Sequence, residues 1–152
     1  MRITKINNID EVLGQQILDL VGIIDDPEMD FNEFTNYFIA NAKENGVFGA
    51  FDDDDLVAFI YAEPPTAIYP NRAYFFIAAS FPTTPVSVSR ELFEYASEWA
   101  RQEGATYWWG WTERNPQVLE RIYGFKAAKE KQIVCPLTDE WPNVRLENTD
   151  VL

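Results

Sequence analysis

The order of hydrophobic and polar residues at the start of the chain predicts a short strand followed by two helices. Polar and apolar side chains alternate over residues 2–6, as in a strand with one buried face. Apolar residues then recur every three or four positions over two stretches, which is the spacing of one helix face. Each stretch opens with a polar residue followed three positions later by glutamate, a capping-box pattern: Asn8 with Glu11, and Asp30 with Glu33.

Three extended segments follow these helices. Residues 47–51 and 56–61 predict two strands joined by the four aspartates at 52–55. Adjacent side chains in a tight turn diverge, whereas a calcium loop spaces its ligands over about twelve residues, so we interpret the aspartates as a solvated turn rather than a metal site. The continuously apolar run 73–80 predicts a central strand buried on both faces.

A proline-punctuated loop then leads into a long helix and an aromatic strand. Thr84 and Pro85 suit the N-cap and the first helical position. The helical pattern is expected to run to about Glu103 and to stop at Gly104. Residues 106–112 predict a strand whose aromatic side chains alternate between its faces. One face carries Tyr107, Trp109 and Trp111, and the other carries Trp108 and Gly110.

The remaining residues predict a short helix, a strand pair and a tail. The helix begins at Asn115-Pro116 and runs through Ile122, and two extended segments follow between 126 and 137. Residues 138–152 are polar and acidic, which is typical of a tail. We therefore expect one α/β domain over 1–137, with a mixed central sheet of about seven strands flanked by about four helices.

The stretch from Gly104 to Phe125 resembles the acyl-CoA-binding half of the GCN5-related N-acetyltransferase (GNAT) superfamily. It shows a helix end, a strand, Asn115, a short helix and then Gly124-Phe125. Members of the superfamily commonly have an asparagine after the fifth strand and a Gly-Phe pair that closes the next helix. The resemblance implies a GNAT-like fold. The aromatic strand with Asn115 also resembles, more loosely, small GNAT-like internal virion proteins of short-tailed bacteriophages.

The cofactor loop of active family members has the pattern Gln/Arg-x-x-Gly-x-Gly/Ala, because glycines let backbone N–H groups approach a pyrophosphate. The corresponding segment here, 81–89, has no glycine, and Pro82 and Pro85 lack N–H groups. No basic residue lies between Arg72 and Arg90. Either the loop only packs the fold, or the helix dipole and nearby polar groups retain a site. The candidate cofactor-binding residues are Thr83, Thr84, Ser87, Ser89 and Asn115.

The acid and the base of the family's reaction are displaced in this sequence. Many members protonate the leaving thiolate with a tyrosine about four residues before the Gly-Phe pair, and that position holds Glu120 here. Tyr123 is either a displaced acid or a packing residue. Glu63, after the third strand, is the nearest candidate base, and Glu113 is another; both are alternatively solvated loop acids.

Composition narrows the remaining chemistry. The chain has no histidine, which removes the commonest general base, the usual Ser/Cys–His dyads and most zinc sites, and we expect no metal. The one cysteine, Cys135, lies in an apolar segment and is interpreted as a buried thiol rather than a nucleophile. A single cysteine also indicates a reducing compartment, so we expect a cytoplasmic protein, or a virion protein if a phage encodes it.

The charge is strongly acidic and uneven. The net charge is −13, and residues 1–71 hold three basic and 14 acidic residues. Such a surface repels nucleic acid and anionic membranes, so we expect neither as a partner. The acidity serves solubility, a basic partner, or DNA mimicry. Large aromatic groups on both faces of one strand imply either a sheet covered on both sides or a contact with a protein partner or a second copy.

Two functional hypotheses follow. The loop glycines, the tyrosine acid and a strand carboxylate are all missing from their usual places, which favours a non-catalytic structural or protein-interaction component, in a phage virion for example, with no cofactor. The alternative is an N-acetyltransferase that transfers acetyl from acetyl-CoA to an amine. An acidic DNA mimic is a minor third hypothesis.

Overall fold

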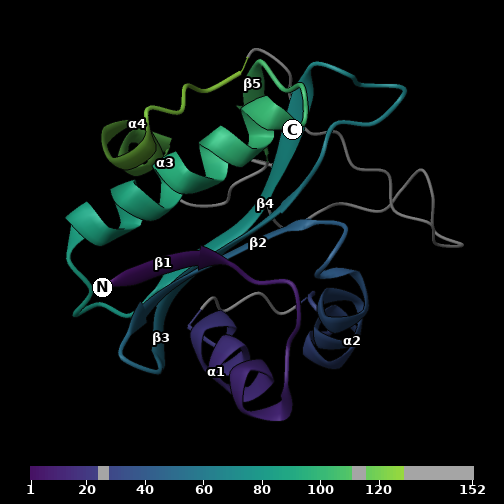
Figure 1. Ribbon diagram of the computed structural model, residues 1–152. Helices are drawn as coiled ribbons and strands as arrows, with labels where there is room; N and C mark the ends of the chain where they lie inside the picture. The colour runs from purple at the N-terminus through teal and green to yellow at the C-terminus, as the bar shows by residue number, and fades with distance from the viewer. Residues whose placement is uncertain (24–27, 111–115, 129–152) are drawn as a thin grey trace, which may run out of the picture. The chain divides into compact units, whose positions relative to one another are not determined.

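The computed structural model describes residues 1–23, 28–110 and 116–128. Contacts divide the chain into two units, 1–115 and 116–152, each of which is described by itself. The first unit holds a five-stranded sheet in the order β1-β2-β3-β4-β5, shown in Figure 1. Its strands are β1 (Arg2–Lys5), β2 (Gly46–Asp52), β3 (Asp55–Glu63), β4 (Arg72–Ser80) and β5 (Tyr107–Trp109). The first four strands pair antiparallel, and β5 pairs parallel with β4.

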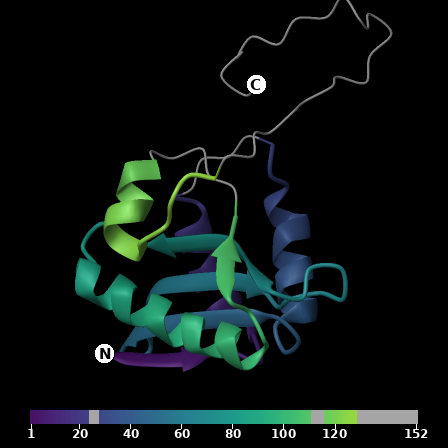
Figure 2. The same cartoon turned by 90° about the horizontal axis from the view of Figure 1, so that it is seen from above.

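Helices cover both faces of this sheet. Helices α1 (Glu11–Val21) and α2 (Phe31–Asn41) pack on one face, and α3 (Val86–Gln102) packs on the other. Figure 2 shows α2 and α3 on opposite sides of the strands. The second unit contributes α4 (Pro116–Tyr123). The mixed α/β architecture with four helices confirms the predicted fold class, although the sheet among the described residues has five strands rather than about seven.

The two faces of the sheet carry separate cores. On the α1/α2 face, Leu20, Phe38 and Phe59 are among the fully buried side chains, and on the α3 face Phe48, Ile60 and Leu92 are buried. Side chains in a strand alternate between faces, so β2 and β3 supply both cores at once. This explains why the central strands contain almost no polar residue.

The helix caps partly match their predictions. Asp30 caps α2 as expected, accepting hydrogen bonds from the amides of Asn32 and Glu33. The predicted start of α1 is wrong by two residues, because Asp10 rather than Asn8 caps it and accepts from the Leu13 amide at 2.8 Å. Both residues are good N-caps, so the local sequence did not decide between them.

The start of α3 also differs from the prediction. Pro85 is the N-cap residue and Val86 is the first helical residue, so the expected Thr84 cap is wrong. The Thr84 hydroxyl instead donates to the Val57 carbonyl of β3 at 3.1 Å, which fixes the loop to the sheet. The other end agrees with the sequence: Glu103 is the C-cap, and Gly104 follows with φ +97°, a conformation that favours glycine.

Two further predictions concern the turn at 52–55 and the end of the chain. β2 ends at Asp52 and β3 begins at Asp55, which confirms the hairpin turn; Asp53 adopts φ +52° there. No group of three or more potential ligands in the described residues is placed to hold a metal ion. The strand expected from 126 does not form over 126–128, and residues 129–152, including the predicted tail, lie outside the described part.

Candidate functional site

The point where β5 leaves β4 is the centre of the candidate site. The two strands pair over three positions, Arg72–Tyr74 of β4 with Tyr107–Trp109 of β5. β4 continues to Ser80, six residues further, with no partner from β5 among the described residues. Gly110 directly follows β5 and lies close to β4, since a Cβ there would meet the Phe75 carbonyl oxygen at 2.6 Å. Beyond Phe75, the described residues of β5 form no pairing with this edge of β4, so its backbone groups over 76–80 form the candidate binding edge.

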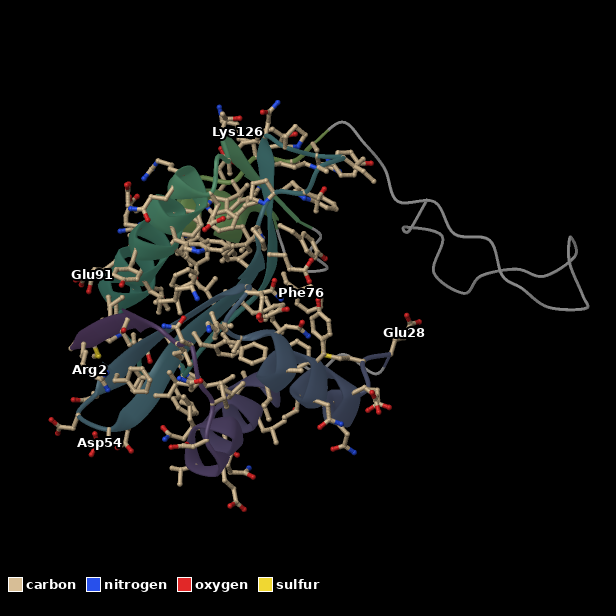
Figure 3. The ribbon with its side chains drawn as sticks, turned by 45° about the vertical axis from the view of Figure 1, so that its right-hand side comes forward. Arg2, Glu28, Asp54, Phe76, Glu91 and Lys126 are labelled. Carbon is tan, nitrogen blue, oxygen red and sulfur yellow. The ribbon has the colours of Figure 1, made fainter. Side chains whose placement is uncertain are left out.

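A β-bulge interrupts β4 near this point. Tyr61 of β3 pairs with Ile77, and the next β3 residue, Ala62, pairs with Phe75, so Phe76 is left out of the register. A bulge leaves its extra residue unpaired and re-aims its side chain. As a result Phe76 lies on the side of β4 that faces α2, where its ring stacks on Phe34 with centroids 5.8 Å apart (Figure 3).

A cluster around Glu63 lies on the same face, next to the bulge. It consists of Glu63 with Tyr37 of α2, Tyr61 of β3, and Tyr74 and Phe76 of β4, and we call it the Glu63 cluster. The Tyr37 hydroxyl donates to Glu63 Oε1 at 3.1 Å. Glu63 and Tyr74 are paired across β3 and β4. The Phe76 ring contacts both Tyr61 and Tyr74 edge to face, each with centroids 5.5 Å apart.

Two tyrosines of this cluster are held neutral. Burial, the neighbouring Tyr37 hydroxyl and the charge of Glu63 raise the pKa of Tyr61 well above its ordinary value. Tyr61 is fully buried, and its hydroxyl oxygen accepts a hydrogen bond from Asn45 Nδ2 at 2.6 Å. Burial, and then the charge of Glu63, also raise the pKa of the Tyr74 phenol. Both phenols therefore remain hydrogen-bond donors at neutral pH.

A positively charged residue borders the cluster. The Arg72 guanidinium stacks between the rings of Tyr69 and Trp109, 3.8 and 4.2 Å from their centroids. The Trp109 ring in turn packs on Tyr74 at 4.7 Å. Arg72 Nε is buried and has no hydrogen-bond partner among the described residues. Arg72 thus contacts Trp109, and Trp109 contacts Tyr74 of the Glu63 cluster, at the start of β4.

The predicted loop residues differ in what they offer. The Thr84 amide donates to the Phe81 carbonyl at 2.9 Å and its hydroxyl to Val57, so neither donor points outward. Ser89 is buried, whereas Thr83 and Ser87 are exposed. The Val88 amide donates to the Pro85 carbonyl at 3.0 Å, and the amides of Val86 and Ser87 precede this first bond of the helix. These two amides are the candidate N–H donors to a ligand at the N-terminus of α3.

The other predicted residues lie in the second unit or outside the described residues. Tyr123 closes α4, and its ring packs edge to face with Phe125 at 6.4 Å. The Gly124 amide donates to the Glu120 carbonyl at 2.8 Å, and Gly124 adopts φ +78°, so the Gly-Phe pair ends the helix as expected. Asn115, Glu113 and Cys135 lie outside the described residues.

The β5 aromatics are divided between the two faces, as the alternation predicts. Trp108 packs on the α3 side, where its Nε1 donates to the Ser97 hydroxyl at 2.9 Å and its ring contacts Phe75 and Phe93. Trp109 packs on Tyr74, on the opposite side. The sheet is therefore covered on the α3 side at Trp108, whereas Tyr107 of the same strand is 53% exposed, and the predicted partner contact stays a prediction.

Sequence reasoning found Glu63 but missed its surroundings. Tyr37, Tyr74 and Phe76 were not candidates, because Tyr74 and Phe76 fall within an apolar strand that the core explains and Tyr37 lies beside a helix stripe. Glu63 directly follows the third predicted strand, and Tyr37 is one position from the predicted buried face of its helix. The position of Tyr37, a polar aromatic residue at the border of a buried helix face, was the signal that could have identified it as a site residue.

Comparisons with known proteins support the fold. No protein-family model and no curated protein matches the chain. Among solved structures, the chain is similar to an aminoglycoside antibiotic 6'-N-acetyltransferase from Acinetobacter haemolyticus, with TM-score 0.71, 17% identity, and coverage of 91% of this chain and 100% of that one. A probable acetyltransferase matches with TM-score 0.69, 17% identity, and coverage of 91% and 100%.

One similar structure contains coenzyme A. It is an aminoglycoside 6'-N-acetyltransferase, with TM-score 0.59, 21% identity, and coverage of 69% of this chain and 58% of that one. At these identities the structural similarity shows the fold alone, and the mixed α/β architecture agrees with it. The chain therefore has the fold of the GCN5-related N-acetyltransferases.

Proposed function

We propose that the chain is an N-acetyltransferase that transfers acetyl from acetyl-CoA to an amine. The observation that carries the proposal is the edge of β4 beyond Phe75, where the described residues of β5 form no pairing and the bulge at Phe76 interrupts the strand. A free strand edge binds an extended ligand through backbone hydrogen bonds. The pantetheine arm of coenzyme A contains amide groups that can form such hydrogen bonds. The similar acetyltransferase structures support the same assignment.

The residues present fit coenzyme A in part. The β4 edge over 76–80 would hold the arm, and the Val86 and Ser87 amides would face a phosphate at the positive end of the 17-residue helix α3. The loop lacks the glycines and the basic residue that would add further phosphate contacts. We therefore expect weaker cofactor binding than a glycine-rich loop provides, with the strand edge contributing the larger share.

The chemistry requires a proton acceptor for the amine. Bound acetyl-CoA would supply a thioester carbon that an amine nitrogen attacks, with loss of the thiol. An ammonium group must lose a proton before it attacks, and we propose that Glu63, beside the bulge, takes it. The leaving thiolate needs a proton in turn. Tyr123 remains our candidate for this step from the sequence.

A proline substitution at the start of α3 tests this site. Val86→Pro removes one presented amide, and proline is well tolerated at the first helical position. Pro85 already has φ −60° and ψ 143°, a conformation compatible with a following proline. Calorimetry should show acetyl-CoA binding to the unaltered chain and weaker binding to Val86→Pro, with Val86→Ala as the matched control. No binding at millimolar acetyl-CoA would refute the proposal.

The second candidate is the non-catalytic, protein-interaction role that the sequence favoured. The loop observation supports it: Thr84 uses both donors within the fold, Ser89 is buried, and prolines occupy two further positions. A loop of this kind is consistent with packing alone. The same calorimetric titration separates the two candidates, because a non-catalytic component has no requirement to bind acetyl-CoA.

A further inference from the structure

We propose that the acceptor is a monoamine whose ammonium group is attached to an apolar, aromatic body, and that the Glu63 cluster binds it. This inference rests on the proposed function, which it deepens by naming the substrate class. It also differs from the aminoglycosides for which several similar structures are named.

Glu63 is a carboxylate that lacks a cationic partner. Its hydrogen bond comes from the neutral Tyr37 hydroxyl, and no lysine or arginine of the described residues forms an ion pair with it. The negative charge of Glu63 also contributes to the raised pKa values of Tyr61 and Tyr74. An ammonium group would supply the missing charge and a donor to the carboxylate.

The surroundings of this carboxylate are aromatic and reachable from solvent. The side chains of Tyr37 and Phe76 are 48% and 37% exposed, and they lie on α2 and β4 on either side of the buried Tyr61. Aromatic faces attract cations and also bury apolar ligand surface. A single carboxylate surrounded by aromatic rings thus suits a ligand with one ammonium group and an aromatic body. The rings would contact the body, and Glu63 would bind the ammonium group.

The neighbouring charge argues against a polycation. Arg72 is held between Tyr69 and Trp109, and Trp109 contacts Tyr74 of the cluster. A second or third ammonium group on the ligand would approach this fixed guanidinium and be repelled. The single carboxylate of the cluster neutralises one positive charge. A monoamine satisfies both conditions.

The cluster is also in the right place for transfer. Tyr74 is the last residue of β4 that pairs with β5, and Phe76 is the bulge residue two positions further. An amine held by Glu63 would therefore lie beside the β4 edge to which we assign the acetyl-CoA arm. One ammonium proton would pass to Glu63, and the amine nitrogen would form the new bond to the acetyl carbon while the carbon–sulfur bond breaks. The second proton that the nitrogen loses balances the departing thiolate, which leaves as the thiol.

The test is calorimetric titration of the full chain with three probes in the absence of acetyl-CoA: 2-phenylethylamine, 2-phenylethanol and spermidine. We expect saturable binding of 2-phenylethylamine, with the neutral alcohol and the polyamine at least about tenfold weaker. Glu63→Gln should weaken 2-phenylethylamine by about tenfold or more and leave 2-phenylethanol unchanged. Glutamine still accepts the Tyr37 hydrogen bond, so the local structure is retained.

Glu91→Gln is the matched control. Glu91 lies on α3, on the opposite face of the sheet (Figure 3), and its substitution should change none of the affinities. The inference is overturned if 2-phenylethylamine does not bind, if Glu63→Gln binds it as tightly as the unaltered chain, or if spermidine binds more tightly. A separate titration with acetyl-CoA alone tests the proposed function: if only that titration fails, the amine site stands and its role as acceptor site falls.

Discussion

Removing the Tyr61 hydroxyl is the most informative change to the packing of the site. Tyr61→Phe keeps the ring, including its contact with Phe38 at 4.7 Å between centroids, so the buried apolar area hardly changes. The substitution removes the acceptor for Asn45 Nδ2, a donor on a residue only 9% exposed. An unsatisfied buried donor costs about 1–3 kcal/mol, so we expect the free energy of unfolding to fall by that amount at pH 7.

The pH dependence of the same variant tests the cause. An unfolded tyrosine ionises near pH 10, about its ordinary pKa, whereas folding holds Tyr61 protonated to higher pH. Between these two pKa values the unfolded state binds fewer protons, so stability is unchanged below about pH 10 and falls as the pH rises above it. Tyr61→Phe lacks this loss. The stability difference between the two proteins should therefore narrow from pH 9 to pH 11, by at most about 1.4 kcal/mol per pH unit.

Urea denaturation followed by circular dichroism measures both effects. Tyr95→Phe is the control, because that side chain is 45% exposed and its substitution should change stability by less than about 0.5 kcal/mol. In a double-mutant cycle, Asn45→Ala combined with Tyr61→Phe should cost less than the sum of the two single changes. The reasoning fails if Tyr61→Phe costs no more than the control, or if its stability difference stays constant up to pH 11.

Two glycine substitutions test the backbone on which the site depends. Gly110→Ala places a Cβ 2.6 Å from the Phe75 carbonyl oxygen, so denaturation should show a loss of about 1–3 kcal/mol; an unchanged stability would mean that β5 does not approach β4 as described. Gly14→Ala in α1 meets only Ile9 Cγ2 at 3.7 Å, an ordinary contact, and should raise stability by about 0.5–1 kcal/mol because alanine favours a helix interior; a loss would indicate that this space is filled.

The sequence predicted the elements whose signals are local. The hairpin at 52–55 and the cap of α2 depend on a few adjacent residues, and both are found in the structure. Position Val12 shows the limit of periodicity: it fits the apolar stripe of α1, yet it is 70% exposed, because the stripe is wider than the face that the sheet covers.

The candidate site depends on contacts between distant residues. Tyr37 and Glu63 are 26 positions apart and meet only when α2 packs on β3. The bulge at Phe76 falls within a continuous apolar run. Because apolar and polar residues do not alternate there, the sequence carries no mark of the extra residue. The sequence therefore located the carboxylate, but it located neither the aromatic neighbours of Glu63 nor the bulge in β4.

Described residues contain no helix long and apolar enough to cross a membrane. The edge of β4 either binds acetyl-CoA or has no ligand. In the first case acetyl-CoA contacts the backbone amides of this edge, and in the second it does not.

The most direct measurement is a titration of the isotope-labelled chain with acetyl-CoA, followed by the backbone amide signals in nuclear magnetic resonance spectra. If acetyl-CoA binds along the edge of β4 over 76–80 and at the start of α3, the amide signals of Phe76, Val86 and Ser87 shift and saturate together, while those of α1 do not move. If none of the three shifts at millimolar acetyl-CoA, or if the shifts occur elsewhere, the account of the site is wrong.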